Sequence, residues 1–137
     1  MTTPRLHHVV FCVRRENQDS AAGMWRDLGF TFTEIDLADI GLRVLLDWDG
    51  GVEIISPSGS GGSEADEVER FLSEHGEGIY SVVVKVPGID SAVTVAERHG
   101  ARVEYRQDRS QPGLTVFESR HSPVHGMPVT FLETNLP

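Results

Sequence analysis

The sequence predicts an α+β protein built from two β-α-β-β-β modules, and three observations support this fold class. Short runs such as residues 5–13 and 79–86 alternate between the two faces of an extended chain and are rich in valine, as strands are. Residues 17–29 and 89–100 place apolar side chains at three- and four-residue spacing, which is typical of amphipathic helices. The same order of elements then occurs a second time along the chain.

The first module is predicted over residues 1–57. Its elements are a strand over 5–13, a helix over 17–29 and strands over 30–36, 41–48 and 51–57. Asn17 or Asp19 can cap the helix start, and Gly29 can end it. The turn between the last two strands is Asp47–Gly51, because its acidic and glycine residues favour tight turns.

Residues 58–78 are predicted to form a linker followed by a short helix. The run SPSGSGGS has the composition of a flexible linker, and it is either a mobile connection or part of a lid. The helix that follows has its apolar residues on one face and acidic residues in its first turn, where they favour the helix dipole.

The second module is predicted over residues 79–137, giving one compact domain overall. It has a strand over 79–86, a helix over 89–100 and strands over 101–107, 113–120 and 127–134. Offsets along the chain support a repeat: His8 to Ser81 is 73 residues, Gly29 to Gly100 is 71 and Glu53 to Glu133 is 80.

Composition limits the partners. The net charge is −9, which argues against nucleic acid and anionic membrane surfaces, since both need a basic face. No leader pattern and no apolar run of membrane-spanning length occurs, so a cytoplasmic location is expected. Cys12 is the single cysteine, so no internal disulfide can form, and its apolar strand predicts a buried thiol.

Three ionisable residues lie in line with bulky apolar neighbours: His8 in the first strand, and Glu53 and Glu133 in the last strand of each module. Burying such groups unpaired costs several kcal/mol, so a partner, a metal or a solvated cavity is needed. If the modules pack about a pseudo-twofold axis, the three can converge. One imidazole and two carboxylates suit a divalent Fe, Mn, Co, Ni or Zn ion. Taken singly, each residue can also be a satisfied core or rim residue.

The segments LHHVVFCV, GVEIISP, FLSEHGEGIYSVVVKV and VTFLET, together with the doubled plan, resemble the vicinal oxygen chelate superfamily. That superfamily includes glyoxalase I, bleomycin-resistance proteins, extradiol dioxygenases and methylmalonyl-CoA epimerase. Local similarity extends to the epimerase and to the N-terminal half of 4-hydroxyphenylpyruvate dioxygenase. The resemblance implies a curved, half-barrel mixed sheet around a cavity, and a homodimer.

In the metal-dependent members each half supplies one ligand from its first strand and one from its last. The resemblance therefore implies His8, Glu53 and Glu133 as metal ligands, with Ser81 where the fourth ligand, normally histidine, is expected. Either three groups hold the metal, or His121 or His125 substitutes, or the metal has been lost. Glu53 and Glu133 are also the candidate catalytic bases.

Four further residues are predicted to bind substrate: Arg43, Tyr80, Ser81 and His121. The epimerases carry a catalytic glutamate in the strand before the last strand of the first half, and alignment puts Arg43 near that position. Arginine cannot act as a base at neutral pH, but it can bind a carboxylate or phosphate through two hydrogen bonds. Tyr80 can point into the cavity or pack in the core.

Two functions remain open on this reasoning. The first is a divalent-metal-dependent lyase, isomerase, epimerase or dioxygenase acting on a small oxygen-rich acid or thioester. The second is a metal-free small-molecule binding or resistance protein of the bleomycin-resistance type, for which Ser81 in place of histidine is the motivating observation. Either function implies a small-molecule ligand.

Overall fold

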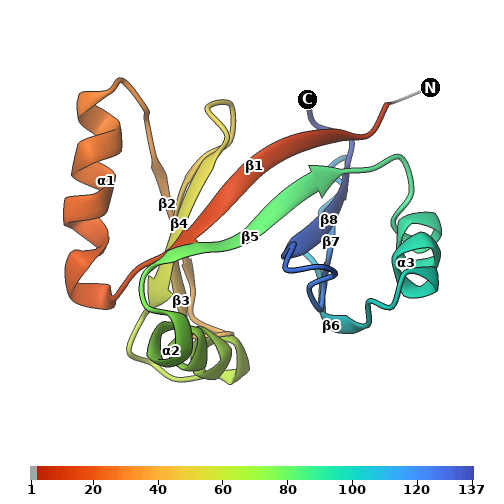
Figure 1. The fold of residues 1–137 in the computed structure, drawn as a ribbon. Helices are drawn as coiled ribbons and strands as arrows, with labels where there is room; N and C mark the ends of the chain where they lie inside the picture. Colours follow the sequence, from red (N-terminus) through yellow and green to blue (C-terminus); the bar gives the residue numbers. More distant parts are fainter. Residues whose placement is uncertain (1–2) are drawn as a thin grey trace. The chain divides into compact units, whose positions relative to one another are not determined.

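The computed structural model describes residues 3–137 as two compact units, each with strands and one or more helices. The first unit is His8–Tyr80, and the second contains Ser81–Pro137 with the residues up to His7. The element order β-α-β-β-β occurs in each, which confirms the predicted α+β class and the repeat. Figure 1 shows the elements coloured along the chain.

The strands of the first unit lie in the order β2-β3-β4-β1. β1 and β4 pair in parallel, whereas β2 with β3 and β3 with β4 pair antiparallel. The elements are β1 (Arg5–Cys12), a 3-10 turn η1 (Arg15–Asn17), α1 (Gln18–Asp27), β2 (Thr33–Leu37), β3 (Leu42–Asp47), β4 (Val52–Pro57) and α2 (Ser63–His75).

The second unit repeats this arrangement in the order β5-β8-β7-β6. Its first and last strands again pair in parallel, and the other neighbours pair antiparallel. The elements are β5 (Gly78–Lys85), α3 (Ile89–Arg98), β6 (Val103–Asp108), β7 (Val116–His121) and β8 (Val129–Thr134). No helix within residues 3–137 is long and apolar enough to cross a bilayer.

Several strands start later than the sequence predicts, because the residues before them make contacts outside the strand ladder. β2 begins at Thr33 rather than at Phe30, since Phe30 and Phe32 pack into the core beside α1. β7 begins at Val116, since Leu114 pairs with Gln111 in a tight bridge. Local alternation cannot distinguish such residues from the strand that follows them.

The apolar core of the first unit lies between α1 and the sheet. Ala22 of α1 packs with Leu45, Val52 and Ile54, and aromatic residues close the cluster around them. The ring of Trp25 lies 5.1 Å from that of Phe30 in an edge-to-face arrangement. These residues come from one stripe of α1 and one face of the sheet, which is what the two periodicities predict.

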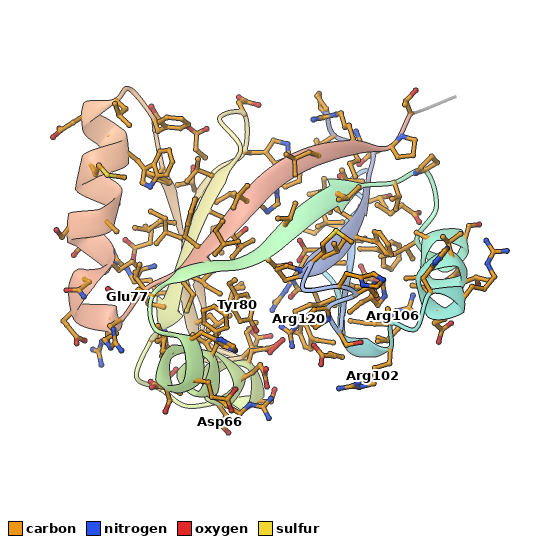
Figure 2. All side chains as sticks on the ribbon, in the orientation of Figure 1. Asp66, Glu77, Tyr80, Arg102, Arg106 and Arg120 are labelled. Atoms are coloured by element: carbon orange, nitrogen blue, oxygen red, sulfur yellow. The ribbon has the colours of Figure 1, made fainter. Side chains whose placement is uncertain are left out.

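The helix starts differ from the predicted caps. Asn17 makes no cap hydrogen bond to α1; its side-chain amide instead donates to Glu77 Oε2 at 2.8 Å. The same oxygen accepts the backbone N–H of Arg14, and these two bonds lower the pKa of Glu77. Figure 2 labels Glu77 on the segment that enters β5. A residue sixty positions along the chain thus supports the start of α1.

The segment predicted as a flexible linker packs closely against the turn before β3. Ser58 N–H donates to Gly41 O at 2.8 Å, and Ala65 N–H donates to Ile40 O at 3.0 Å. Gly41 has φ +79, and a Cβ there would lie 2.2 Å from Gly61 O. Glycine is therefore required at Gly41 by both its backbone conformation and this contact.

Cys12 is fully buried at the end of β1, as the sequence predicts. Burial, reinforced by the nearby carboxylates Glu77 and Glu69, raises the pKa of its thiol to about 12. The thiol therefore stays protonated at neutral pH and acts as a small apolar side chain.

The largest fully buried polar side chain of the first unit is Gln18, at the start of α1. Its amide donates to Arg43 O at 2.9 Å and to Ile54 O at 3.0 Å, which links the helix to β3 and β4. Replacing it with Gln18→Leu leaves both carbonyls without this donor. We expect a loss of about 2 kcal/mol in the free energy of unfolding, measured by urea denaturation.

The matched control is Gln111→Leu, which makes the same change at an exposed residue. We expect it to change the unfolding free energy by less than about 0.5 kcal/mol. Equal effects of the two substitutions would contradict a structural role for the Gln18 amide.

Candidate functional site

The strand register decides which side chains of the first unit share a face. Val10 pairs with Glu53 across the parallel β1–β4 ladder. Paired residues point to the same side, and alternate residues of a strand return to it. His8, Val10 and Glu53 therefore lie on one face, as the sequence predicts for His8 and Glu53.

His8 and Glu53 are in direct contact on that face. His8 Nε2 lies 3.2 Å from Glu53 Oε1. The imidazole is almost inaccessible, with 1% of its side chain exposed, whereas 18% of the Glu53 side chain reaches solvent. The histidine is thus the inner member of the pair and the carboxylate is the member that an incoming molecule meets.

Next to this pair lies a pocket that the sequence did not indicate. The ring of Trp48 stands 6.3 Å from that of His8, and Leu46 is the register partner of Glu53. Both residues line a pocket of about 380 Å³ in the first unit, together with Thr31, Thr33, Ile35, Asp47 and Asp49. The His8–Glu53 pair and this pocket form the candidate site.

Arg43 lies on the opposite face of the same sheet, contrary to its predicted place in the site. Its register partner is Ser56, and its guanidinium donates to Gln18 and Asp19 of α1 and to Glu34 of β2. The contact with Glu34 lowers the pKa of that carboxyl group and raises the pKa of Arg43. The alignment placed Arg43 one position off the site face, and a shift of one residue reverses the face.

The residues of β3 on the site face are Leu42, Val44 and Leu46, because Leu46 pairs with Glu53 and the others alternate with it. None of the three can take up or release a proton. The position at which the resemblance implied a second catalytic carboxylate therefore carries an aliphatic side chain.

The second unit holds a pair of hydroxyl groups on its corresponding face. Val83 pairs with Thr130 across the parallel β5–β8 ladder, so Ser81 and Thr130 share a face. Ser81 Oγ lies 2.7 Å from Thr130 Oγ1, and both residues are buried. The two hydroxyls satisfy one another.

The two ladders show that Thr130, and not Glu133, is the counterpart of Glu53. Val9 N–H donates to Gly51 O in the first unit, and Val82 N–H donates to Pro128 O in the second. Glu53 and Thr130 each follow the acceptor by two positions. The sequence-based pairing of Glu53 with Glu133 was therefore wrong by three residues, an odd number that also reverses the face.

Glu133 lies on the face that α3 covers, away from Ser81. It shares that face with Phe117, its register partner on β7. Its Oε1 accepts the backbone N–H of Ile89 at 2.8 Å, at the first residue of α3. This carboxylate therefore caps the start of α3, and a negative charge suits a helix start.

His121 also lies on the α3 side of the second unit. Its Nε2 lies 3.1 Å from Ser119 Oγ, and its ring packs 4.8 Å from that of Phe131, the register partner of Ser119. Its Nδ1 has no hydrogen-bond partner among residues 3–137, and burial lowers the pKa of the imidazole. The structure does not bring His121 to the Ser81–Thr130 pair. His125, the other predicted substitute, has a positive φ in the turn before β8.

Tyr80 packs against α2, one of the two alternatives that the sequence left open. Its ring lies 5.0 Å from that of Phe71, edge to face. Figure 2 labels Tyr80 beside α2. This contact supports a packing role, and a role in binding substrate stays a prediction.

The donor groups can be tested against the divalent metal that the resemblance implied. The first unit offers an imidazole and a carboxylate, but the equivalent pair of the second unit is two hydroxyls, which are poor ligands for transition metals. Glu133 is turned to α3. Within residues 3–137 no three histidine, cysteine or acidic side chains gather in a group that could hold a metal. The residues do not fit the four-ligand site.

Sequence reasoning missed Trp48 of the site and Thr130, the counterpart of Glu53 in the second unit. Trp48 is in a turn between strands, where periodicity does not indicate the side of the sheet to which a side chain points. A stricter comparison of the last strands could have found Thr130: GVEII and PVTFL align with valine beside valine, which puts Thr130 opposite Glu53.

We expect Glu133→Ala to lower the free energy of unfolding by about 1 kcal/mol, because α3 loses its cap and a favourable charge. Urea denaturation followed by circular dichroism measures the change. Glu74→Ala, an exposed position at the end of α2, is the control and should have little effect. An unchanged stability of Glu133→Ala would contradict the capping role.

Stability should also depend on pH through His121. Its pKa is lowered in the folded state from an ordinary value of 6.5, so the unfolded chain binds the proton more readily. Its contribution to stability is full above pH 6.5 and is lost as the pH falls below that value. Glu97 of α3 and Glu104 of β6 oppose this shift, and Arg106 reinforces it.

The measurement is the free energy of unfolding against pH for the parent protein and for His121→Leu. The substituted protein should show a flatter dependence between pH 6.5 and lower values. His75→Ala removes an exposed histidine and should leave the slope unchanged. A slope that does not respond to His121→Leu would contradict the assignment.

Comparison with known proteins supports the fold. No family model and no curated protein matches the chain. Among solved structures, it is similar to a hypothetical protein from Bacillus halodurans, with a TM-score of 0.76 and 17% identity over 99% of this chain and 98% of that one.

A second similar structure is a variant of the Streptomyces coelicolor methylmalonyl-CoA epimerase in complex with 2-nitronate-propionyl-CoA. Its TM-score is 0.73, with 19% identity over 96% of this chain and 98% of that one. A mutant of 4-hydroxymandelate synthase from Streptomyces coelicolor follows, with a TM-score of 0.71 and 15% identity over 98% of this chain and 50% of that one. The chain therefore has the glyoxalase-like fold of these neighbours, as the resemblance predicted.

Proposed function

We propose that this chain binds a small organic molecule on the His8–Glu53 face of its first unit, and that it does so without a divalent metal. The observation that carries the proposal is the register of the two units. Where the first unit has an imidazole and a carboxylate, the second has Ser81 and Thr130, which bond to one another.

Glu53 is the group that would meet the ligand. It is the more exposed member of the pair, and His8 lies behind it. A carboxylate can only accept hydrogen bonds, so the contact needs the hydrogen of His8 on Nε2. This donation fixes one oxygen of Glu53. The other oxygen can accept a hydroxyl or amine hydrogen from the ligand, and a charge-assisted bond of this kind is strong.

The same arrangement limits any chemistry at the site. Inversion of a carbon centre by two opposed bases needs a second proton-transferring group, and β3 contributes only Leu42, Val44 and Leu46 to this face. Glu53 alone can serve as a single general base, which suits an isomerase or lyase more than an epimerase. Binding without turnover requires no further group.

A metal-dependent enzyme is the second candidate, and one observation favours it. The nitrogen of His8 and the oxygen of Glu53 are 3.2 Å apart, close enough to bind one ion together. Bound there, Fe, Mn, Co, Ni or Zn would polarise the oxygen atoms of a small acid or thioester. The missing ligands of the second unit count against this function. Homodimerisation and a cytoplasmic location stay predictions.

The deciding experiment uses protein treated with EDTA and dialysed. We expect a panel of small organic amines, alcohols and acids to contain compounds that raise its melting temperature, and added Mn, Co, Ni or Zn to change that rise little. Glu53→Gln should weaken binding of an active compound about tenfold, since a charge-assisted hydrogen bond is lost.

The matched control is Glu34→Gln, which changes the same residue type on the opposite face of the sheet. It should leave affinity unchanged. Stoichiometric metal in protein purified without chelator, lost in His8→Ala, would support the metal-dependent enzyme instead and would overturn the proposal.

A further inference from the structure

We propose that the pocket beside Glu53 selects an organic cation with a flat apolar body, and this inference rests on the proposed function. The pocket of about 380 Å³ is large enough for a compact molecule and lies wholly in the first unit. Its apolar walls indicate the flat body of the ligand, and its acidic side chains indicate the positive charge.

The walls provide an apolar surface. Leu46 and Ile35 lie on the site face, since Leu46 pairs with Thr33 and alternates with Val44, the partner of Ile35. Ile35 is 37% exposed, so part of its apolar surface is available to a ligand in this pocket. Trp48 adds a broad ring that rests near His8. A flat apolar body would bury these surfaces and gain from ring contact.

The charges are of one sign. Asp47 and Asp49 line the pocket, Glu53 is the neighbour of Leu46, and none of the described residues lining the pocket is lysine, arginine or histidine. Asp47 pairs with Val52, so its side chain points to the α1 face, where its carboxylate accepts the backbone N–H groups of Thr31 and Gly50. Asp49 and Glu53 are therefore the acidic groups assigned to the ligand. Acidic groups around a hollow of low polarity raise the local concentration of cations.

Trp48 can contact both the apolar body and the charged group of the ligand. It stands between Asp47 and Asp49 in the chain, and an indole face attracts a cation more strongly than other aromatic rings do. An ammonium group beside this ring would lie near Asp49, whose carboxylate could accept its N–H hydrogens. A carboxylate or phosphate at the same place would be repelled and would lose its hydration without a basic partner.

This inference reverses the expectation of an acidic substrate, which rested on Arg43. That guanidinium lies on the α1 face and is held by Gln18, Asp19 and Glu34. The epimerase complex contains a CoA ester. The pocket described here has no cationic side chain with which to hold such an anion.

The test is a charge series on one skeleton: phenethylamine, 2-phenylethanol and phenylacetate. Each is titrated into the EDTA-treated protein at low salt. The indole N–H resonances of the two tryptophans are followed by NMR, and Trp48→Phe identifies the signal of Trp48. We expect phenethylamine to shift the Trp48 signal with the highest affinity and phenylacetate with the lowest. Added salt should reduce the preference.

Two substitutions probe the walls. Trp48→Leu should weaken phenethylamine binding about threefold, as expected for loss of a cation–π contact. Asp49→Asn should reduce the preference for amine over alcohol and leave the alcohol unaffected. Asp27→Asn, which removes the same charge at the end of α1, is the control and should change neither.

The outcomes separate this inference from the proposed function. The cation inference is overturned if phenylacetate binds as tightly as phenethylamine, or if binding is unchanged by the substitutions at Trp48 and Asp49. In that case, weaker binding in Glu53→Gln would still support the proposed function. If none of the three compounds shifts the Trp48 signal at concentrations up to about 10 mM, the proposal that this pocket binds a ligand is overturned.

Discussion

The structure depends on the parallel pairing of the first and last strands of each unit. This ladder brings β1 beside β4 and β5 beside β8, and it fixes which residue of the late strand faces the same side as a given residue of the early one. The intervening helix and strands occupy the connection that a parallel pair requires. The chemistry of each face follows from one choice of register, since a slip of a single residue would exchange the two faces.

The fold could be predicted almost entirely from the sequence, because its helices, strands and turns each have a local sequence pattern. The valine-rich runs, the helical stripes around Ala21 and Trp25 and the glycines at Gly29 and Gly100 mark elements that the structure contains. The candidate site was predicted less well. His8 and Glu53 each alternate with apolar neighbours in their own strands, and the repeat and the family resemblance placed both in one site. Placing Arg43, Glu133 and His121 required the exact register of strands that are distant in the sequence. The spacing of the repeats defines that register only to within a few residues.

Duplication explains why the two units can differ so much at equivalent positions. A fold of this kind needs apolar residues between helix and sheet, and Ile54 and Ala22 supply them in the first unit. The opposite face also buries Val10, Val44 and Ile55, but its polar groups need only be satisfied, and more than one set of side chains meets this requirement. An imidazole with a carboxylate satisfies it in one unit, and two hydroxyls satisfy it in the other. The sheet can therefore keep its architecture while one half loses its ionisable groups.

The buried sulfur at the end of β1 has a practical consequence. Cys12 is fully covered and its thiol ionises only near pH 12, so it should resist alkylation while the protein remains folded. A cysteine placed on an exposed strand or helix would then be the one reactive sulfur in the molecule. With one cysteine introduced in each unit, a pair of spin labels or fluorescent dyes could be attached without first removing Cys12, and the distance between the two units could be measured in solution.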